Sequence, residues 1–234
     1  MDPETAKAIV QLAKIVAPVA AASPTVGDLV KRVVGPTADL FGERIRKCFE
    51  RSDQMVYDAR ETTQNAAPNI VIPLIQAAAL AEHETIQEMF AALLTNARIP
   101  DGNAARPSFI SIVSQLAPDE AMLFKAIGTL SDEYRVFQLG FNHIPQPQRM
   151  AQATSFVEHY LVKVRNALPV VQDESDGNRK LRCETCILVL EGLRLVTNQQ
   201  VSHAPSPTNA PIPVVSELGW ALLRACRPPE PKAS

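Results

Sequence analysis

The chain has 234 residues, 46% of them hydrophobic, which is enough to bury a core in one large domain or two small ones. Its 23 Lys and Arg residues nearly balance 25 Asp and Glu residues, and the net charge of −2 excludes a strong general attraction to nucleic acid or anionic lipid. Ala, Leu, Ile and Val far outnumber the aromatic residues, a composition that favours packed helices over a β-sandwich.

The first part of the chain predicts two helices, at residues 4–19 and 24–34, where apolar residues recur at helical spacing. Acidic residues stand where a signal peptide would have its basic region, and no apolar run reaches the ~20 residues needed to span a bilayer. We therefore expect a cytoplasmic protein, and association with a membrane surface stays open.

A third helix is predicted after Gly35-Pro36 and continues toward Arg60. Its basic and apolar residues form an amphipathic segment that could contact anionic lipid or a protein partner, although core packing explains the same pattern. The candidate membrane or partner residues are Phe41, Arg44, Ile45, Arg46, Lys47 and Phe49.

Residues 69–123 show the clearest helical punctuation in the chain. We expect Pro73 in the first turn of one helix, an apolar stripe on the next, a loop at residues 100–107 and then a short helix. Pro118, Asp119 and Glu120 predict a further helix start, because proline suits the first turn and carboxylates suit the positive end of the helix dipole.

The pattern weakens from Ser131 to Pro147, where Pro145 and Pro147 indicate a boundary. After this boundary the sequence predicts helices at 155–168 and 179–191, strands within 193–201 and at 212–215, and a helix at 216–226. This order is typical of a winged-helix unit. We expect an α-helical domain at 1–141, a winged-helix-like domain at 148–228 and a disordered tail at 229–234. The predicted fold is mainly α, a multi-helix bundle followed by a small α+β winged-helix-like C-terminal unit.

Cys183 and Cys186 form the sharpest chemical pattern, because a C-x-x-C pair can hold half of a zinc site or act in redox chemistry. Both lie on the predicted apolar face, where cysteine packs as a small hydrophobe. The four histidines are dispersed, and no catalytic or nucleotide-binding motif is present. We expect no catalytic residue, cofactor or metal; enzymatic activity stays undecided, and a non-enzymatic protein is favoured.

Three basic residues near the start of the predicted recognition helix, Arg179, Lys180 and Arg182, are the nucleic-acid candidates, since they could meet phosphates or bases. Glu184 and Glu191 on the same helix weaken that interpretation. The alternative is that this unit serves as a protein interface.

Several segments taken in order resemble the Abi-alpha (abortive infection alpha) family of bacteria. The resemblance lies in Gly-Pro before an amphipathic helix, Leu-Leu-x-Asn-Ala at Leu93–Ala97, Leu-x-Pro-x-Glu-Ala at Leu116–Ala121, and Leu218-Gly219. It implies a bacterial protein that takes part in phage defence by abortive infection. Because the sequence also lacks catalytic clusters, we expect the protein to act without catalysis, through protein association or the membrane. A protein partner or homo-oligomer is expected, and a phage component, nucleic acid or peripheral membrane contact stays open. The alternative function is a DNA-binding regulator that uses the C-terminal unit.

Overall fold

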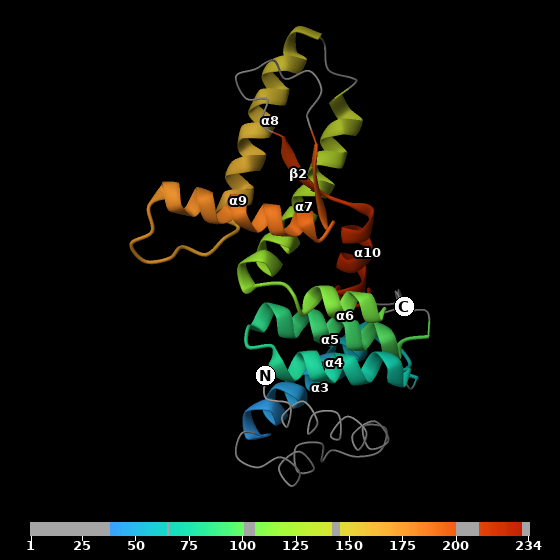
Figure 1. The fold of residues 1–234 in the computed structure, drawn as a ribbon. Helices are drawn as coiled ribbons and strands as arrows, with labels where there is room; N and C mark the ends of the chain where they lie inside the picture. The colour runs from blue at the N-terminus through green and yellow to red at the C-terminus, as the bar shows by residue number, and fades with distance from the viewer. Residues whose placement is uncertain (1–37, 65, 101–105, 142–145, 200–210, 231–234) are drawn as a thin grey trace. The chain divides into compact units, whose positions relative to one another are not determined.

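The computed structural model describes residues 38–64, 66–100, 106–141, 146–199 and 211–230 (Figure 1). The chain divides into two compact units, one formed by residues 1–116 with 224–234 and the other by residues 117–223. The described residues form eight helices and one two-stranded sheet, which confirms the mainly α fold. The helices expected at 4–19 and 24–34 lie outside the described residues.

The first unit contains four described helices, α3 (Ala38–Ala59), α4 (Pro68–Leu80), α5 (Glu84–Arg98) and α6 (Pro107–Val113). Helix α5 is at its centre and packs against the other three (Figure 1). Ten of its 15 residues are buried, among them the expected apolar stripe of Ile86, Met89, Phe90, Leu93 and Leu94. This stripe forms the core of the unit.

The expected place of Pro73 in a first turn is wrong. Pro68 takes the first turn of α4, where its missing N–H costs nothing, and Pro73 lies inside the helix. Helix α5 follows after a short break, and its start is capped by the His83 side chain, whose Nδ1 accepts a hydrogen bond from Thr85 N at 3.3 Å.

The second unit contains three long helices, α7 (Pro118–Phe141), α8 (Gln146–Asn166) and α9 (Asp176–Gly192). Helix α7 continues through the segment where the apolar pattern weakens, because its far end packs on α8 through aromatic rings. Phe137 stacks on Phe156 with ring centroids 4.1 Å apart, and Tyr134 lies 6.0 Å from the same ring. Pro147 therefore lies in the first turn of α8, and Pro145 lies outside the described residues.

A small antiparallel sheet completes the second unit, formed by β1 (Val196–Gln199) and β2 (Ile212–Val215), with Val196 opposite Val215. Tyr160 Oη donates to Pro213 O at 2.6 Å, and Val215 N donates to Ser131 Oγ at 3.0 Å, so α8 and α7 both hold β2. Helix α10 (Glu217–Ala225) follows. The predicted order of helix, strand, strand and helix is confirmed, and the loop predicted between the strands lies outside the described residues. The winged-helix assignment and the predicted domain limits stay predictions.

Two residues in the segments that carry the family resemblance form hydrogen bonds with the backbone. Asn96, which is 4% exposed, donates from Nδ2 to Ala225 O at 2.8 Å and to Arg227 O at 2.9 Å. Glu120 Oε2 accepts from Ala117 N at 2.7 Å at the start of α7, which is half of a capping box. These polar residues satisfy backbone groups that the helix ends leave without partners.

Gly219 is required by close packing between α10 and the chain entering β1. A Cβ atom at this position would lie 2.1 Å from Leu195 O. Because that oxygen belongs to the backbone, no side-chain rotation could relieve the clash. Only glycine fits here.

Candidate interaction surface

Helix α9 begins and ends with ordinary capping signals. Ser175 Oγ accepts from Asn178 N at 3.3 Å, and Asp176 places a carboxylate in the first turn. Beyond the last residue, Arg194 adopts a φ of 59°, and Leu195 N donates to Leu190 O at 2.9 Å. One side of the helix, with Cys183, Cys186 and Leu190, is buried.

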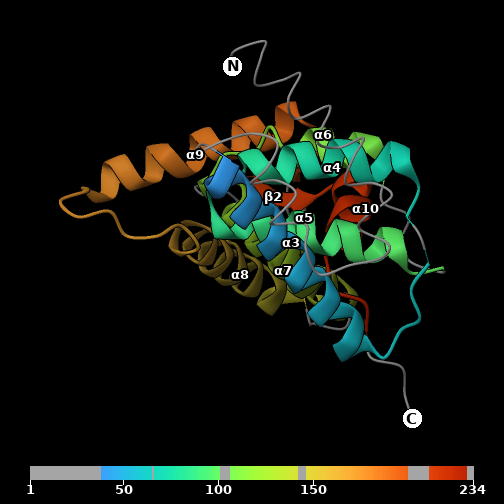
Figure 2. The same ribbon diagram turned by 90° about the horizontal axis from the view of Figure 1, so that it is seen from below.

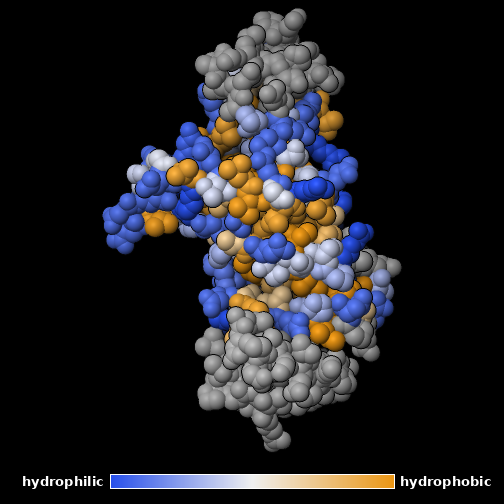
Figure 3. Space-filling view, viewed as in Figure 1, coloured by the Kyte–Doolittle hydropathy of each residue, from blue (hydrophilic) through white to orange (hydrophobic). Residues whose placement is uncertain are grey.

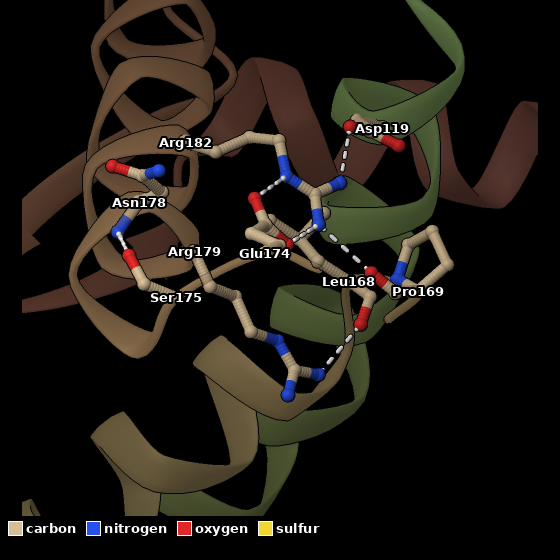
Figure 4. Close-up of polar contacts among 8 residues, drawn as sticks. All are labelled: Asp119, Leu168, Pro169, Glu174, Ser175, Asn178, Arg179 and Arg182. Atoms are coloured by element: carbon tan, nitrogen blue, oxygen red, sulfur yellow. Dashed lines mark hydrogen bonds and ion pairs between the residues drawn. The ribbon is translucent and has the colours of Figure 1, made fainter. Parts of the chain in front are cut away.

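Arg182, one of the nucleic-acid candidates, is held by a network inside the second unit (Figure 4). Its Nε and Nη2 donate to the two oxygens of Glu174 at 2.9 and 2.7 Å, and Nη1 donates to Asp119 Oδ2 at 2.7 Å. Nη2 also donates to Pro169 O at 2.8 Å. The hydrogen bond from Arg182 lowers the pKa of the Glu174 carboxyl group from its ordinary value of 4.5. The network joins α9 to the loop before it and to α7.

Arg179 and Lys180 differ in what their side chains contact. Arg179 Nη2 donates to Leu168 O at 2.8 Å, next to the end of α8, as Figure 4 shows. Lys180 lies on the surface with its ammonium group 3.8 Å from Glu184 Oε1. The structure thus places the three candidates on one helix but turns two guanidinium groups toward the protein. Their role in nucleic-acid binding stays a prediction.

The side of α9 opposite its buried face is apolar along its middle. Leu181 is 62% exposed and Leu188 is 66% exposed, and Gly177, Thr185 and Gly192 are exposed on the same side. Figures 1 and 2 show the first half of α9 extending beyond α7 and α8, and in Figure 3 apolar patches lie among hydrophilic residues on this arm. We call this row of five residues the α9 stripe.

The α9 stripe was not predicted from the sequence. The sequence signal for it is a pair of leucines seven residues apart on the side of the helix opposite the cysteines. One buried stripe is enough to pack a helix on its own protein, so this pair is an additional apolar feature. A second apolar side on a helix with charged neighbours makes this side a candidate interaction surface.

A groove of about 430 Å³ runs along α9 beside the stripe. Its apolar walls are formed by Leu161 and Val164 of α8, Ile187 and Leu188 of α9, and Pro213 of β2. Lys180 and Glu191 lie among its other lining residues. The groove is therefore a mainly apolar depression with charges of both signs at its edge.

The predicted membrane or partner segment lies in α3, where its apolar residues face the core of the first unit. Ile45 is 1% exposed and packs with Ile75 and Ala79, while Phe41 and Phe49 pack against this cluster and stay partly accessible. Its apolar face is thus largely used by α4.

The basic side chains of that segment form ion pairs. Arg44 reaches Glu82 at 3.3 Å and also donates to Ala79 O at 3.3 Å, which joins α3 to the end of α4. Arg46 pairs with Glu50 and Lys47 with Glu43 along the helix, at 3.3 and 2.8 Å. None of the helices in the described part of the chain is long and apolar enough to cross a membrane.

The four cysteines are buried, and burial raises the pKa of the Cys186 thiol to about 11 and that of Cys48 to about 12. Such thiols carry little thiolate at neutral pH. Within the described ranges, no three His, Cys, Asp or Glu side chains gather in a way that could hold a metal ion. Cys183 and Cys186 act here as part of the packed side of α9.

Comparison with known proteins gives one match. No curated protein and no solved structure is significantly similar to this chain. A family model described as "Abortive infection alpha" matches residues 40–208, a span that includes α3 to α9 and β1 and covers more than half of the chain. The chain therefore belongs to the abortive infection alpha family.

Proposed function

We propose that this protein contributes to phage defence without catalysing a reaction and that it acts through protein association. Membership of the family indicates a role in abortive infection, in which an infected cell stops growing or dies before phage is released. The α9 stripe is the observation that supports association, because exposed leucines in a row on a helix suit a partner surface. A cytoplasmic location in a bacterium fits this role.

Action at the membrane is a different mechanism for the same role. It would use Phe41 and Phe49 with the basic residues of α3, and it requires α3 to leave its packing against α4, because Ile45 is buried there. Dye-loaded anionic vesicles separate the two mechanisms. Association predicts vesicles that stay intact in the presence of the protein, and dye release would favour membrane action.

DNA binding is the second candidate function, favoured by Lys180 on the exposed side of α9 and by the order of α8, α9, β1 and β2. Lys180→Ala is the clean variant, because replacing Arg182 would also break its network with Glu174 and Asp119. Fluorescence anisotropy at low salt, where phosphate contacts are strongest, should show weaker binding for Lys180→Ala than for a Lys47→Ala control. Equal binding would remove Lys180 from any such site.

A plaque assay tests the defence role directly. The protein is expressed in a phage-sensitive bacterium and challenged with a broad phage panel, while membrane potential and nucleic-acid integrity are followed during infection. The proposal predicts fewer plaques for some phages, with infected cells that stop dividing before either membrane potential or nucleic acid is lost. Unchanged plaque counts across the whole panel would contradict it.

A further inference from the structure

The α9 stripe has a two-fold symmetry that its sequence makes visible. The midpoint of the stripe lies between residues 184 and 185. Leu181 and Leu188 are equally far from it on either side, and so are Gly177 and Gly192. Turning the helix end for end about that point exchanges the two leucines and exchanges the two glycines. An isologous interface requires such a self-complementary surface.

We propose that α9 packs antiparallel against α9 of a second copy of this chain, with the two-fold axis passing near Thr185. This inference rests on the proposed mode of action, association, and names the surface and the partner. Leu181 of each copy then contacts Leu188 of the other, and both leucines leave water. Gly177 of each copy faces Gly192 of the other.

On one flank of α9, Lys180 and Glu191 favour this arrangement over a parallel one, while Glu184, the acidic residue nearest the axis, lies 3.8 Å from Lys180 of its own helix. Lys180 in the first half of the helix and Glu191 in the second half lie on the same flank of the stripe, at the edge of the groove. An antiparallel pair places Lys180 of each copy beside Glu191 of the other, whereas in a two-fold parallel pair this flank of one copy lies on the opposite side from that of the other, and the two charges do not meet. The helix dipoles also oppose each other in the antiparallel pair.

The space around the stripe suits a second helix. A Cβ atom at Gly192 would meet nothing within 4 Å, and one at Gly177 would meet only Ser175 Oγ of the same cap at 3.9 Å. The ends of the stripe therefore allow close approach of another backbone. The groove beside Leu188 leaves room for the leucine of the partner.

A second exposed apolar pair in the chain serves as the control. Val136 and Leu139 of α7 are 70% and 71% exposed, but no symmetric set of residues surrounds them on that helix. They match the leucines of the stripe in number and exposure. The proposal assigns them no contact.

Light scattering after size-exclusion chromatography tests the pairing on the full purified chain across a dilution series. The wild type should have twice the mass of one chain, and Leu181→Glu with Leu188→Glu should weaken the dimer by at least about 100-fold. Val136→Glu with Leu139→Glu should leave it unchanged. A wild type that is monomeric throughout, or a stripe variant that dimerises like the wild type, overturns the proposal. Circular dichroism checks that each variant is folded.

Cross-linking tests the position of the axis. Thr185→Cys should form a disulfide-linked dimer under mild oxidation, while Thr129→Cys on α7, an exposed threonine with the same bond to the carbonyl four residues earlier, should not. Equal cross-linking of the two variants contradicts an axis near Thr185.

Charge exchange tests the direction of the helices. Lys180→Glu should weaken the dimer about 2- to 5-fold, and adding Glu191→Lys should restore it. A double variant that is weaker than the single one contradicts the antiparallel arrangement. These measurements use purified protein, so they can fail while the plaque assay succeeds, and the reverse also holds.

Discussion

Replacement of Asn96 is the most direct test of the hydrogen bonds that join α5 to the end of α10 and the residues after it. It is buried on α5, and its two N–H groups donate to Ala225 O and Arg227 O at 2.8 and 2.9 Å. Asn96→Leu removes both donors at similar volume and leaves one buried and one partly buried carbonyl without them, at a cost of about 2–3 kcal/mol in unfolding free energy. Asn96→Asp adds a carboxylate that faces two carbonyl oxygens, which raises the cost to about 3–5 kcal/mol at neutral pH.

Urea denaturation followed by far-UV circular dichroism measures both variants, with Asn69→Asp, an exposed change in the first turn of α4, as the control. The control should lie within about 0.5 kcal/mol of the wild type. The excess cost of Asn96→Asp over Asn96→Leu should shrink as the pH is lowered, because a protonated carboxyl group can donate one of the lost bonds. An Asn96→Asp variant as stable as the wild type at neutral pH would refute the reasoning.

Three further predictions follow from single contacts. Gly219→Ala places a methyl group against Leu195 O and should cost about 1–3 kcal/mol in thermal or urea unfolding, whereas Gly140→Ala, which meets nothing within 4 Å, should not destabilise the protein; equal effects would disprove the close approach. Because the pKa of Glu174 is lowered below 4.5, its stabilisation is present above that pH and is lost as the pH falls through the folded-state value. Glu174→Gln should therefore be less stable than the wild type at neutral pH but not in acid, and a difference in urea midpoints that persists in acid would contradict the ion pair. Cys48, whose pKa burial raises to about 12, should react with Ellman's reagent only after denaturation, and fast labelling of the native protein would show that it is accessible.

Much of the fold could be predicted from the sequence because helical periodicity and capping residues are local signals. The stripe on α5 and the start of α7 at Pro118 follow directly from such patterns. The prediction for Pro73 is wrong, since a proline in the first turn of a helix and a proline inside a helix look the same in an apolar run. The length of α7 was also hidden, because rings from another helix stabilise its last turns and neighbours along the chain do not.

The candidate site was harder to predict because it depends on which contacts the chain uses internally. Arg182 and Lys180 look equivalent in the sequence, yet only folding brings Glu174 and Asp119 to the guanidinium group of Arg182. In the sequence, Leu181 and Leu188 do not differ from leucines that pack in a core. Only their exposure in the structure separates them from the buried side of α9. For the basic residues and for the leucines alike, contacts with residues distant in the sequence determine which side chains stay exposed.

By our proposal, this protein acts in phage defence by association through α9. The most direct measurement is the efficiency of plaquing on cells that express the wild type, the Leu181→Glu with Leu188→Glu variant, or the Val136→Glu with Leu139→Glu control at equal protein level. We predict protection by the wild type and the control and loss of protection by the stripe variant. Protection by the stripe variant equal to that of the wild type would contradict the claim.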